Sequence, residues 1–214
     1  EIVIDFSTGS DNTTRTLRYT SRLFRDPSAW YHIVYAVDTT QATGSNRIKL
    51  YVNGEQQDLD NIVDGTWPTQ NGEGHINNAI KHGIGYRSNT NDYYFNGYLA
   101  DVYFIDGSQL DPTSFGAFDS NGVWQAAAYS GTYGTNGFHL LDFANESTVG
   151  HDSSGNNNDF TANNITDRTP TTLPAVNFDG SGDYLELADS TDWDFGTGDF
   201  TVECYAYFRA ITVN

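Results

Sequence analysis

Alternating apolar and polar positions run through much of the chain and predict β-strands. Residues 30–38 combine aromatic and β-branched side chains, and residues 47–52 alternate basic with apolar side chains before Asn53-Gly54. An Asn-Gly pair that follows such a segment is a strong signal for a tight turn. We therefore expect residues 30–38 and 47–52 to form an antiparallel pair connected by the loop 39–46.

Further strands are predicted by the same kind of pattern, and no segment has a sustained helical period. The expected strands cover residues 98–105, 137–143, 175–178, 184–187 and 200–208. One turn of helix is expected at residues 112–115, because Asp111 can cap it and Pro112 suits its first position. The polar segments 58–78 and 87–92 are expected to be long loops. The pattern thus indicates an all-β protein.

Composition agrees with this fold class. The 214 residues include 14 Tyr, 13 Phe and 21 Gly, and Met is absent. Aromatic side chains suit half-buried strands, whereas Gly, Asn and Asp favour tight turns. The length is enough for one large β-sandwich or two small domains. The single cysteine, Cys204, excludes an internal disulfide.

The charge is strongly acidic, with 28 Asp and Glu against 10 Lys and Arg and a formal net charge of −18. Nucleic acid is not an expected partner, because phosphate binding needs clustered basic side chains. We expect no membrane insertion, since no apolar run is long enough to span a bilayer. The acidity fits an exterior protein and supplies carboxylates of the kind that bind calcium.

Several motifs carry a family resemblance. The sequences DSSGNNND, VNFDGSGDYLEL and GDFTVEC, at residues 152–159, 176–187 and 198–204, resemble the opening half of a laminin-G-like, concanavalin A-like jelly roll. The sequences WYHIV, YVNG and FNGYLADV, at residues 30–34, 51–54 and 95–102, resemble its closing half. Residues 24–32 and 131–138 further resemble structural proteins of marine tailed phages that carry such domains. The resemblance implies a two-sheet antiparallel jelly-roll sandwich.

The order of the two halves departs from that family. Residues 1–118 resemble the closing half, residues 119–135 are a connecting segment, and residues 136–214 resemble the opening half. The chain is either a slice of a tandem array or a chain whose halves complete each other. Half a sandwich would leave an apolar face and strand edges in water. We therefore expect one sandwich with its halves in permuted order, or strand exchange between subunits.

Catalysis is not expected. Retaining glucan hydrolases of concanavalin-like fold need two carboxylates about 5–5.5 Å apart. The nearest approach to this pattern is Glu1 and Asp5, which share a strand face but lie roughly 13 Å apart at ~3.3 Å per residue. The sequence has no nucleophile elbow and no phosphate-binding loop of the Walker type. A glucan-active hydrolase therefore ranks behind the binding hypotheses.

Two acidic loops are candidates for calcium, which binds hard oxygen ligands at close spacing. The candidate ligands are Asp152, Asn156 and Asp159 in the first loop, and Asp189, Asp192 and Asp194 in the second. Neither loop has the glycine that an EF-hand carries at its sixth position. The competing interpretation is that these side chains hydrogen-bond their own turns.

A carbohydrate site would need an aromatic platform beside polar groups. The candidates are Trp67, Tyr86, Asn89, Asn91, Asp92, Tyr93 and Tyr94. The competing interpretation places these aromatic side chains in the core or at an interface, where such residues are also common.

The leading hypothesis is a non-catalytic structural or adhesion module. The phage resemblance implies a virion or other extracellular surface, where the partners would be other copies of the chain, neighbouring subunits and cell-surface glycans. The alternative is a free-standing, calcium-dependent carbohydrate-binding domain of lectin type.

Overall fold

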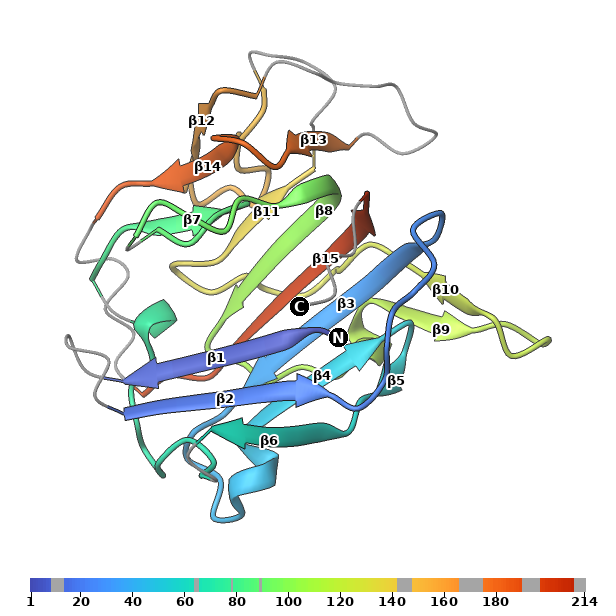
Figure 1. Ribbon diagram of the computed structural model, residues 1–214, viewed down its shortest axis with the longest axis vertical. Coiled ribbons are helices and arrows are strands. Elements are labelled where there is room, and N and C mark those ends of the chain that lie inside the picture. Colours follow the sequence, from blue (N-terminus) through green and yellow to red (C-terminus); the bar gives the residue numbers. More distant parts are fainter. Residues whose placement is uncertain are drawn as a thin grey trace.

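The computed structural model describes residues 1–8, 14–63, 66–77, 79–88, 90–141, 148–165, 175–189 and 197–209. Within these ranges the chain forms antiparallel β-sheets with three short 3-10 helices and no α-helix (Figure 1). The predicted all-β fold is therefore confirmed. No helix in the described part of the chain is long and apolar enough to cross a membrane.

The largest sheet has the strand order β11-β8-β15-β3-β4-β5, and β13 pairs with another part of β8. Its strands are β3 (Trp30–Val37), β4 (Ile48–Val52), β5 (Glu55–Gln56), β8 (Asn96–Asp106), β11 (Phe138–Leu140), β13 (Val176–Asp179) and β15 (Phe200–Phe208). The predicted pair of residues 30–38 and 47–52 is confirmed, with Val37 opposite Ile48. The predicted loop 39–46 contains the short helix η1 (Gly44–Asn46).

The turn after β4 also follows its sequence signal. Asn53 and Gly54 have φ angles of 50° and 79°, the left-handed conformation that Asn-Gly pairs adopt in tight hairpins. Val52 then lies opposite Glu55 of β5. A Cβ atom on Gly54 would lie 2.2 Å from the ring of Trp124, so this position needs glycine for space as well as for conformation.

Strand β15 lies between β3 and β8, and it brings the two ends of the chain into one sheet. Cys204 lies opposite Ile33 of β3, and Glu203 lies opposite Tyr103 of β8. The strands β11 and β13 also pair with β8. Strands from residues 136–214 thus share a sheet with strands from residues 1–118 of the same chain.

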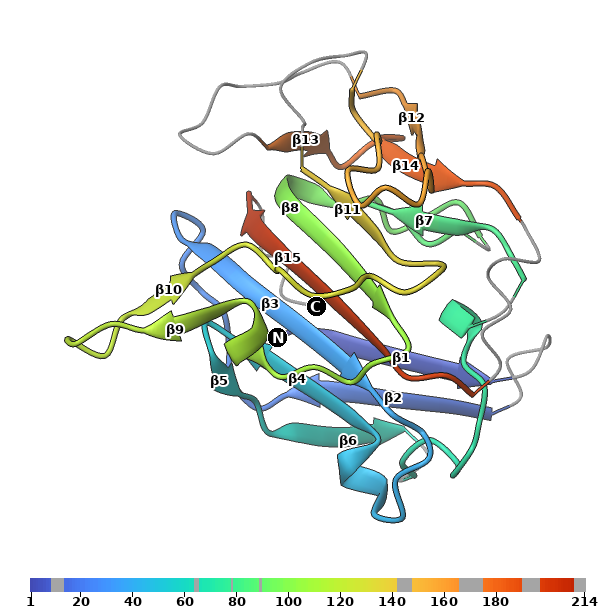
Figure 2. The same cartoon turned by 180° about the vertical axis from the view of Figure 1, so that it is seen from behind.

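The second layer consists of two three-stranded sheets (Figures 1 and 2). One has the order β1-β2-β6, formed by Val3–Thr8, Thr14–Thr20 and Leu59–Val63. The other has the order β12-β14-β7, formed by Thr161–Asn163, Tyr184–Leu187 and His82–Ile84. The expectation that residues 58–78 form one long loop was wrong, because β6 begins at Leu59 and pairs with β2. Two polar residues inside β6, Asp60 and Asn61, hide its strand character in the sequence.

One apolar core joins the two layers. It brings Phe6 of β1 and Leu185 of β14 together with Phe104, Phe178 and Phe200 of the large sheet. Phe178 and Phe200 have no exposed surface, and burial of such a side chain contributes about 1.5–3 kcal/mol. The core therefore depends on strands from both ends of the chain.

The outer face of the large sheet is covered by residues 107–136 (Figure 2). This segment contains the short helix η3 (Pro112–Ser114) and the hairpin of β9 (Gly116–Phe118) with β10 (Trp124–Ala126). The predicted helical turn is confirmed, because the Asp111 side chain accepts a hydrogen bond of 2.9 Å from the backbone N–H of Thr113. A second apolar cluster, which includes Tyr103 and Phe115, lies under the segment.

Candidate functional site

The loop between β7 and β8 carries most of the predicted carbohydrate-binding residues. Tyr86 packs against Tyr184 with ring centroids 4.1 Å apart, and it stacks on Tyr94 at 6.2 Å. Its hydroxyl donates to Glu186 at 2.8 Å, and Glu186 also pairs with Lys81 at 3.1 Å. Burial and the bond to Glu186 raise the pKa of Tyr86 to about 12. Tyr86 is therefore a fixed, neutral support for the loop.

Tyr93 is the exposed aromatic side chain of this loop, with 76% of its surface in solvent. The guanidinium of Arg87 lies 4.4 Å from the centre of its ring. Arg87 in turn donates two hydrogen bonds to the carboxylate of Asp92, at 2.9 and 2.8 Å. Such a bidentate pair fixes the plane of the guanidinium. Arg87 therefore backs the Tyr93 ring, while the rest of the ring faces solvent.

The backbone of this loop is held in an uncommon conformation. Asn91 and Tyr93 both have a φ of 54°, in the left-handed region. For a bulky residue this conformation is an outlier, which costs roughly 1–2 kcal/mol and occurs preferentially at ligand sites. Backbone hydrogen bonds of 2.9 Å from Arg87 to Asp92 and from Asn91 to Arg87 stabilise it. We call Arg87, Asn91, Asp92, Tyr93 and Tyr94 the tyrosine shelf.

A cavity of about 870 Å³ opens at the tyrosine shelf. Arg87, Tyr93 and Tyr94 line it on the shelf side. Phe6 of β1 and Leu99 of β8 are among its apolar lining residues. The volume is within the range of about 300–1,000 Å³ that is typical of small-molecule sites.

The remaining predicted carbohydrate residues do not join the shelf. Trp67 lines a different cavity, beside Ile48 of β4 and Leu59 of β6. The guanidinium of Arg18 lies 3.7 Å from the centre of its indole ring. Asn89 lies outside the described residues. The structure thus brings together Tyr86, Asn91, Asp92, Tyr93 and Tyr94.

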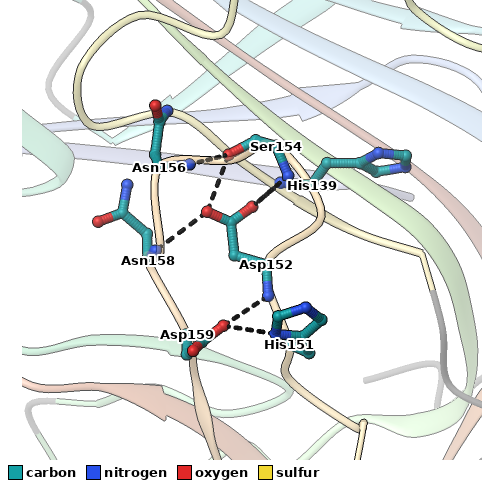
Figure 3. A network of polar contacts seen from close by, with 7 residues as sticks. All are labelled: His139, His151, Asp152, Ser154, Asn156, Asn158 and Asp159. Atoms are coloured by element: carbon teal, nitrogen blue, oxygen red, sulfur yellow. Dashed lines mark hydrogen bonds and ion pairs between the residues drawn. The ribbon is translucent and has the colours of Figure 1, made fainter.

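The first predicted calcium loop is a closed hydrogen-bond network centred on Asp152 (Figure 3). One carboxylate oxygen of Asp152 accepts from the backbone N–H groups of His139 and Ser154, both at 2.8 Å. The other accepts from the Ser154 hydroxyl at 2.8 Å and from the backbone N–H of Asn158 at 3.0 Å. Asp152 is only 4% exposed. Both of its oxygens therefore already have protein donors.

The other two residues of this loop are engaged in the same way. An oxygen of Asp159 accepts from the backbone N–H of Asp152 at 2.8 Å and lies 2.9 Å from a ring nitrogen of His151. The side-chain amide of Asn156 donates to the carbonyl oxygens of Gly134 and Gly137, at 2.7 and 2.8 Å. For Asp152 and Asp159 this geometry favours the interpretation that the side chains hydrogen-bond their own turn, whereas Asn156 holds the turn to the preceding segment.

The second predicted calcium loop is described only in part. Asp189 is exposed after the end of β14, and Asp192 and Asp194 lie outside the described residues. Within the described ranges, no group of three or more His, Cys, Asp or Glu side chains is placed to hold a metal ion. A calcium site remains a prediction.

A buried polar cluster that the sequence analysis did not identify lies on the outer face of the large sheet. Nε2 of His32 lies 2.7 Å from Oε1 of Glu203, and the two residues are 3% and 1% exposed. The indole N–H of Trp124 donates to Nδ1 of His32 at 3.1 Å. Beside them, Nε2 of His139 lies 2.6 Å from the carboxylate of Asp101. The cluster thus ties β10 to the sheet.

The pKa values of this cluster reflect its burial. Burial lowers the pKa of His32 to about 4, although the charge of Asp101 opposes the shift. Burial raises the pKa of Glu203 well above its ordinary value, and Asp101 adds to this shift. Asp101 has a φ of 53°, and the register of β15 against β8 shifts beside it. The sequence signal for this cluster was Glu203, a charged residue in the middle of the apolar strand 200–208, because a buried charge needs a partner.

Together, the large sheet and the two smaller sheets packed on it define a two-layer antiparallel β-sandwich module. The family model of the Concanavalin A-like lectin/glucanases superfamily matches residues 3–113, just over half of the 214 residues. The chain belongs to this superfamily, and the family resemblance seen in the sequence is confirmed to that extent. No curated protein and no solved structure matches the chain.

Proposed function

We propose that this protein is a non-catalytic adhesion module that binds glycans on its tyrosine shelf. The observation that carries the proposal is Tyr93, a 76% exposed ring in a left-handed backbone, backed by the guanidinium of Arg87. Aromatic rings present flat apolar faces on which the C–H faces of sugars can stack. Around the ring, Arg87, Asn91 and Asp92 supply hydrogen-bond donors and acceptors for hydroxyl groups.

The absence of catalysis is part of the proposal. Glycoside hydrolysis generally uses two carboxyl groups, and the shelf contains one, Asp92, which is paired with Arg87. Asp101 and Glu203 do lie on neighbouring strands of the large sheet. Glu203 is 1% exposed, however, and its carboxyl group meets His32 instead of solvent. Residues 107–136 pack over this face of the sheet.

We place the module at an extracellular or virion surface, as the resemblance to phage structural proteins implies. The net charge of −18 supports this location, because it favours solubility of an exposed protein. Protein–protein contact is the second candidate function. It is favoured by the hairpin of β9 and β10, which projects from the body of the molecule (Figure 1) and exposes 49% of Phe118 and 55% of Val123.

A glycan array tests the first function against the second. We expect the wild-type protein to bind a defined set of glycans, in calcium and in chelator alike. Tyr93→Ala should lower this binding about tenfold, the effect of one good stacking contact. Phe118→Ala is the matched control, because it removes an exposed aromatic ring far from the shelf, and it should not change glycan binding.

Three results would change the assignment. Equal binding by wild type and Tyr93→Ala would overturn the role of the shelf. A lack of glycan binding together with self-association that Phe118→Ala abolishes, measured by sedimentation, would support the protein-contact function instead. Release of reducing sugar from a glucan by the protein would overturn the non-catalytic assignment.

A further inference from the structure

The cavity at the tyrosine shelf continues from the polar loop to the apolar interior of the sandwich. Three strands of the large sheet contribute to its lining through Tyr35 of β3, Leu99 of β8 and Phe208 of β15. Phe6 of β1 and Ile80 of the segment before β7 also line it. Aliphatic and aromatic side chains from both layers thus line one space, together with the polar residues Ser7, His75, Ser88 and Asn96.

The charged groups of this cavity lie on its solvent side. Arg87 is exposed and paired with Asp92, and Asp5 is exposed and accepts a hydrogen bond of 2.8 Å from the Ser7 hydroxyl. Burial raises the pKa of Tyr35, and the charge of Asp5 adds to the shift, so the Tyr35 hydroxyl stays neutral. Ile80 is 39% exposed, so apolar surface of the cavity wall remains in contact with water. Such a surface gains free energy from an apolar ligand.

We propose that this cavity binds the apolar part of an amphiphilic glycan, such as an alkyl glycoside or a glycolipid, while its sugar lies on the tyrosine shelf. The apolar half of this proposal depends on the cavity alone, and the sugar half rests on the glycan-binding function proposed above. The volume of about 870 Å³ suits a site that encloses much of a small ligand. The site is polar at the shelf and apolar inside. An amphiphilic glycan likewise has a polar sugar followed by an apolar chain.

Alkyl β-D-glucosides of increasing chain length, used below their micelle-forming concentrations, test the proposal by calorimetry. Each methylene group that enters an apolar site should raise the affinity about fourfold. We therefore expect affinity to rise steadily from the methyl to the octyl glucoside. The corresponding alcohols without the sugar should show the same slope with chain length at lower affinity.

Two matched variants place the effect in the molecule. Ile80→Asp puts a charge on the cavity wall and should lower the affinity for octyl glucoside at least about tenfold. Leu23→Asp makes the same change at a residue that is 45% exposed and does not line the cavity, and it should bind as wild type does. Tyr93→Ala should lower the affinity for every glucoside by a common factor and leave the slope unchanged.

The outcomes separate the two halves of the proposal. Equal affinities of the wild-type protein for methyl and octyl glucoside would overturn the apolar site without any variant, and would leave a sugar site on the shelf. If Ile80→Asp and Leu23→Asp change the increase of affinity with chain length equally, the apolar site would also be overturned. Equal affinities for glucosides and alcohols, unchanged by Tyr93→Ala, would overturn the glycan-binding function and support the apolar cavity.

Discussion

Nε2 of His32 lies 2.7 Å from Oε1 of Glu203, and both side chains are buried. The tautomer of His32 follows from Trp124, because its indole N–H can only donate and it contacts Nδ1 of His32 at 3.1 Å. Nδ1 therefore carries no proton, and the imidazole is neutral with its proton on Nε2. The groups around it are Glu203 and Tyr205 on β15 and Asp101 on β8, and Tyr103 of β8 lies opposite Glu203.

Glu203→Gln should make the protein more stable relative to wild type as the pH rises. The pKa of Glu203 is raised in the folded state, so its contribution to stability is present below the unfolded pKa of 4.5 and is lost above it. Glutamine keeps an oxygen beside Nε2 of His32 and has no proton to release. The lowered pKa of His32 acts in wild type and variant alike, so it cancels in the difference.

Urea unfolding of wild type and Glu203→Gln at about pH 5, 6.5 and 8 measures this difference. We expect the free energy of unfolding of the variant, minus that of wild type, to increase across the series. A difference that stays constant or decreases with pH would show that Glu203 is not held in its neutral form.

Asp199 should make the free energy of unfolding depend on pH in a lower and narrower pH range than Glu203 does. Its pKa is raised from 3.8 to about 6, by burial and by the nearby carboxylate of Asp38. A raised pKa contributes stability that is complete below the unfolded pKa and is lost as the pH rises through the folded value, here between about 4 and 6. Asp199→Asn removes the titrating group and should flatten melting temperature against pH in this window.

The control for this variant is Asp58→Asn, at an exposed position. It should retain the wild-type dependence of melting temperature on pH between about 4 and 6. If Asp199→Asn also retains that dependence, the pairing of Asp199 with Asp38 does not govern this part of the pH profile.

Asp152→Ala tests the interpretation of its loop as a self-contained turn. The change leaves four donors without their acceptor, three backbone N–H groups and the hydroxyl of Ser154. Because hydrogen bonds to a charged group contribute about 1.5–3 kcal/mol each, we expect a loss of at least about 3 kcal/mol in the free energy of unfolding. If the loop is a self-contained turn, Asp152→Ala should lower the melting temperature by the same amount in calcium and in chelator. A calcium-dependent rise that Asp152→Ala abolishes would instead establish a metal site.

Local signals in the sequence were sufficient for several elements. The Asn53-Gly54 turn and the turn capped by Asp111 each depend on residues that are neighbours in the chain, and both formed as predicted. The aromatic residues around Tyr93 were identified because they lie next to polar residues in the sequence. The left-handed backbone of Tyr93 was not, because it depends on how Arg87 and Asp92 close the loop.

The features that escaped prediction depend on pairing between distant parts of the chain. Strand β2 is rich in Thr and Arg, and its partners β1 and β6 are what make it a strand. His32 and Glu203 meet only because β15 lies beside β3. No local pattern around either residue specifies the other. The cavity was inaccessible to prediction for the same reason, since its lining comes from both ends of the chain.

The proposed apolar site requires β15 to lie beside β3, because Tyr35 and Phe208 both line the cavity, and the structure pairs these strands within one chain. Ile33 lies opposite Cys204, and both side chains pack against the apolar core. Directly opposed residues of antiparallel strands have Cα atoms about 4.5–5.5 Å apart, which is a suitable separation for a disulfide. Ile33→Cys therefore places a second thiol beside the native one. Val34→Cys is the control, since the adjacent side chain points to the other face of the sheet.

The most direct measurement is non-reducing electrophoresis with thiol titration after oxidation of dilute Ile33→Cys protein. One chain that completes its own sandwich predicts a monomer with no free thiol, while Val34→Cys stays reduced. A disulfide-linked dimer would show that β15 is exchanged between copies, and two free thiols in the Ile33→Cys monomer would show that β15 does not lie beside β3.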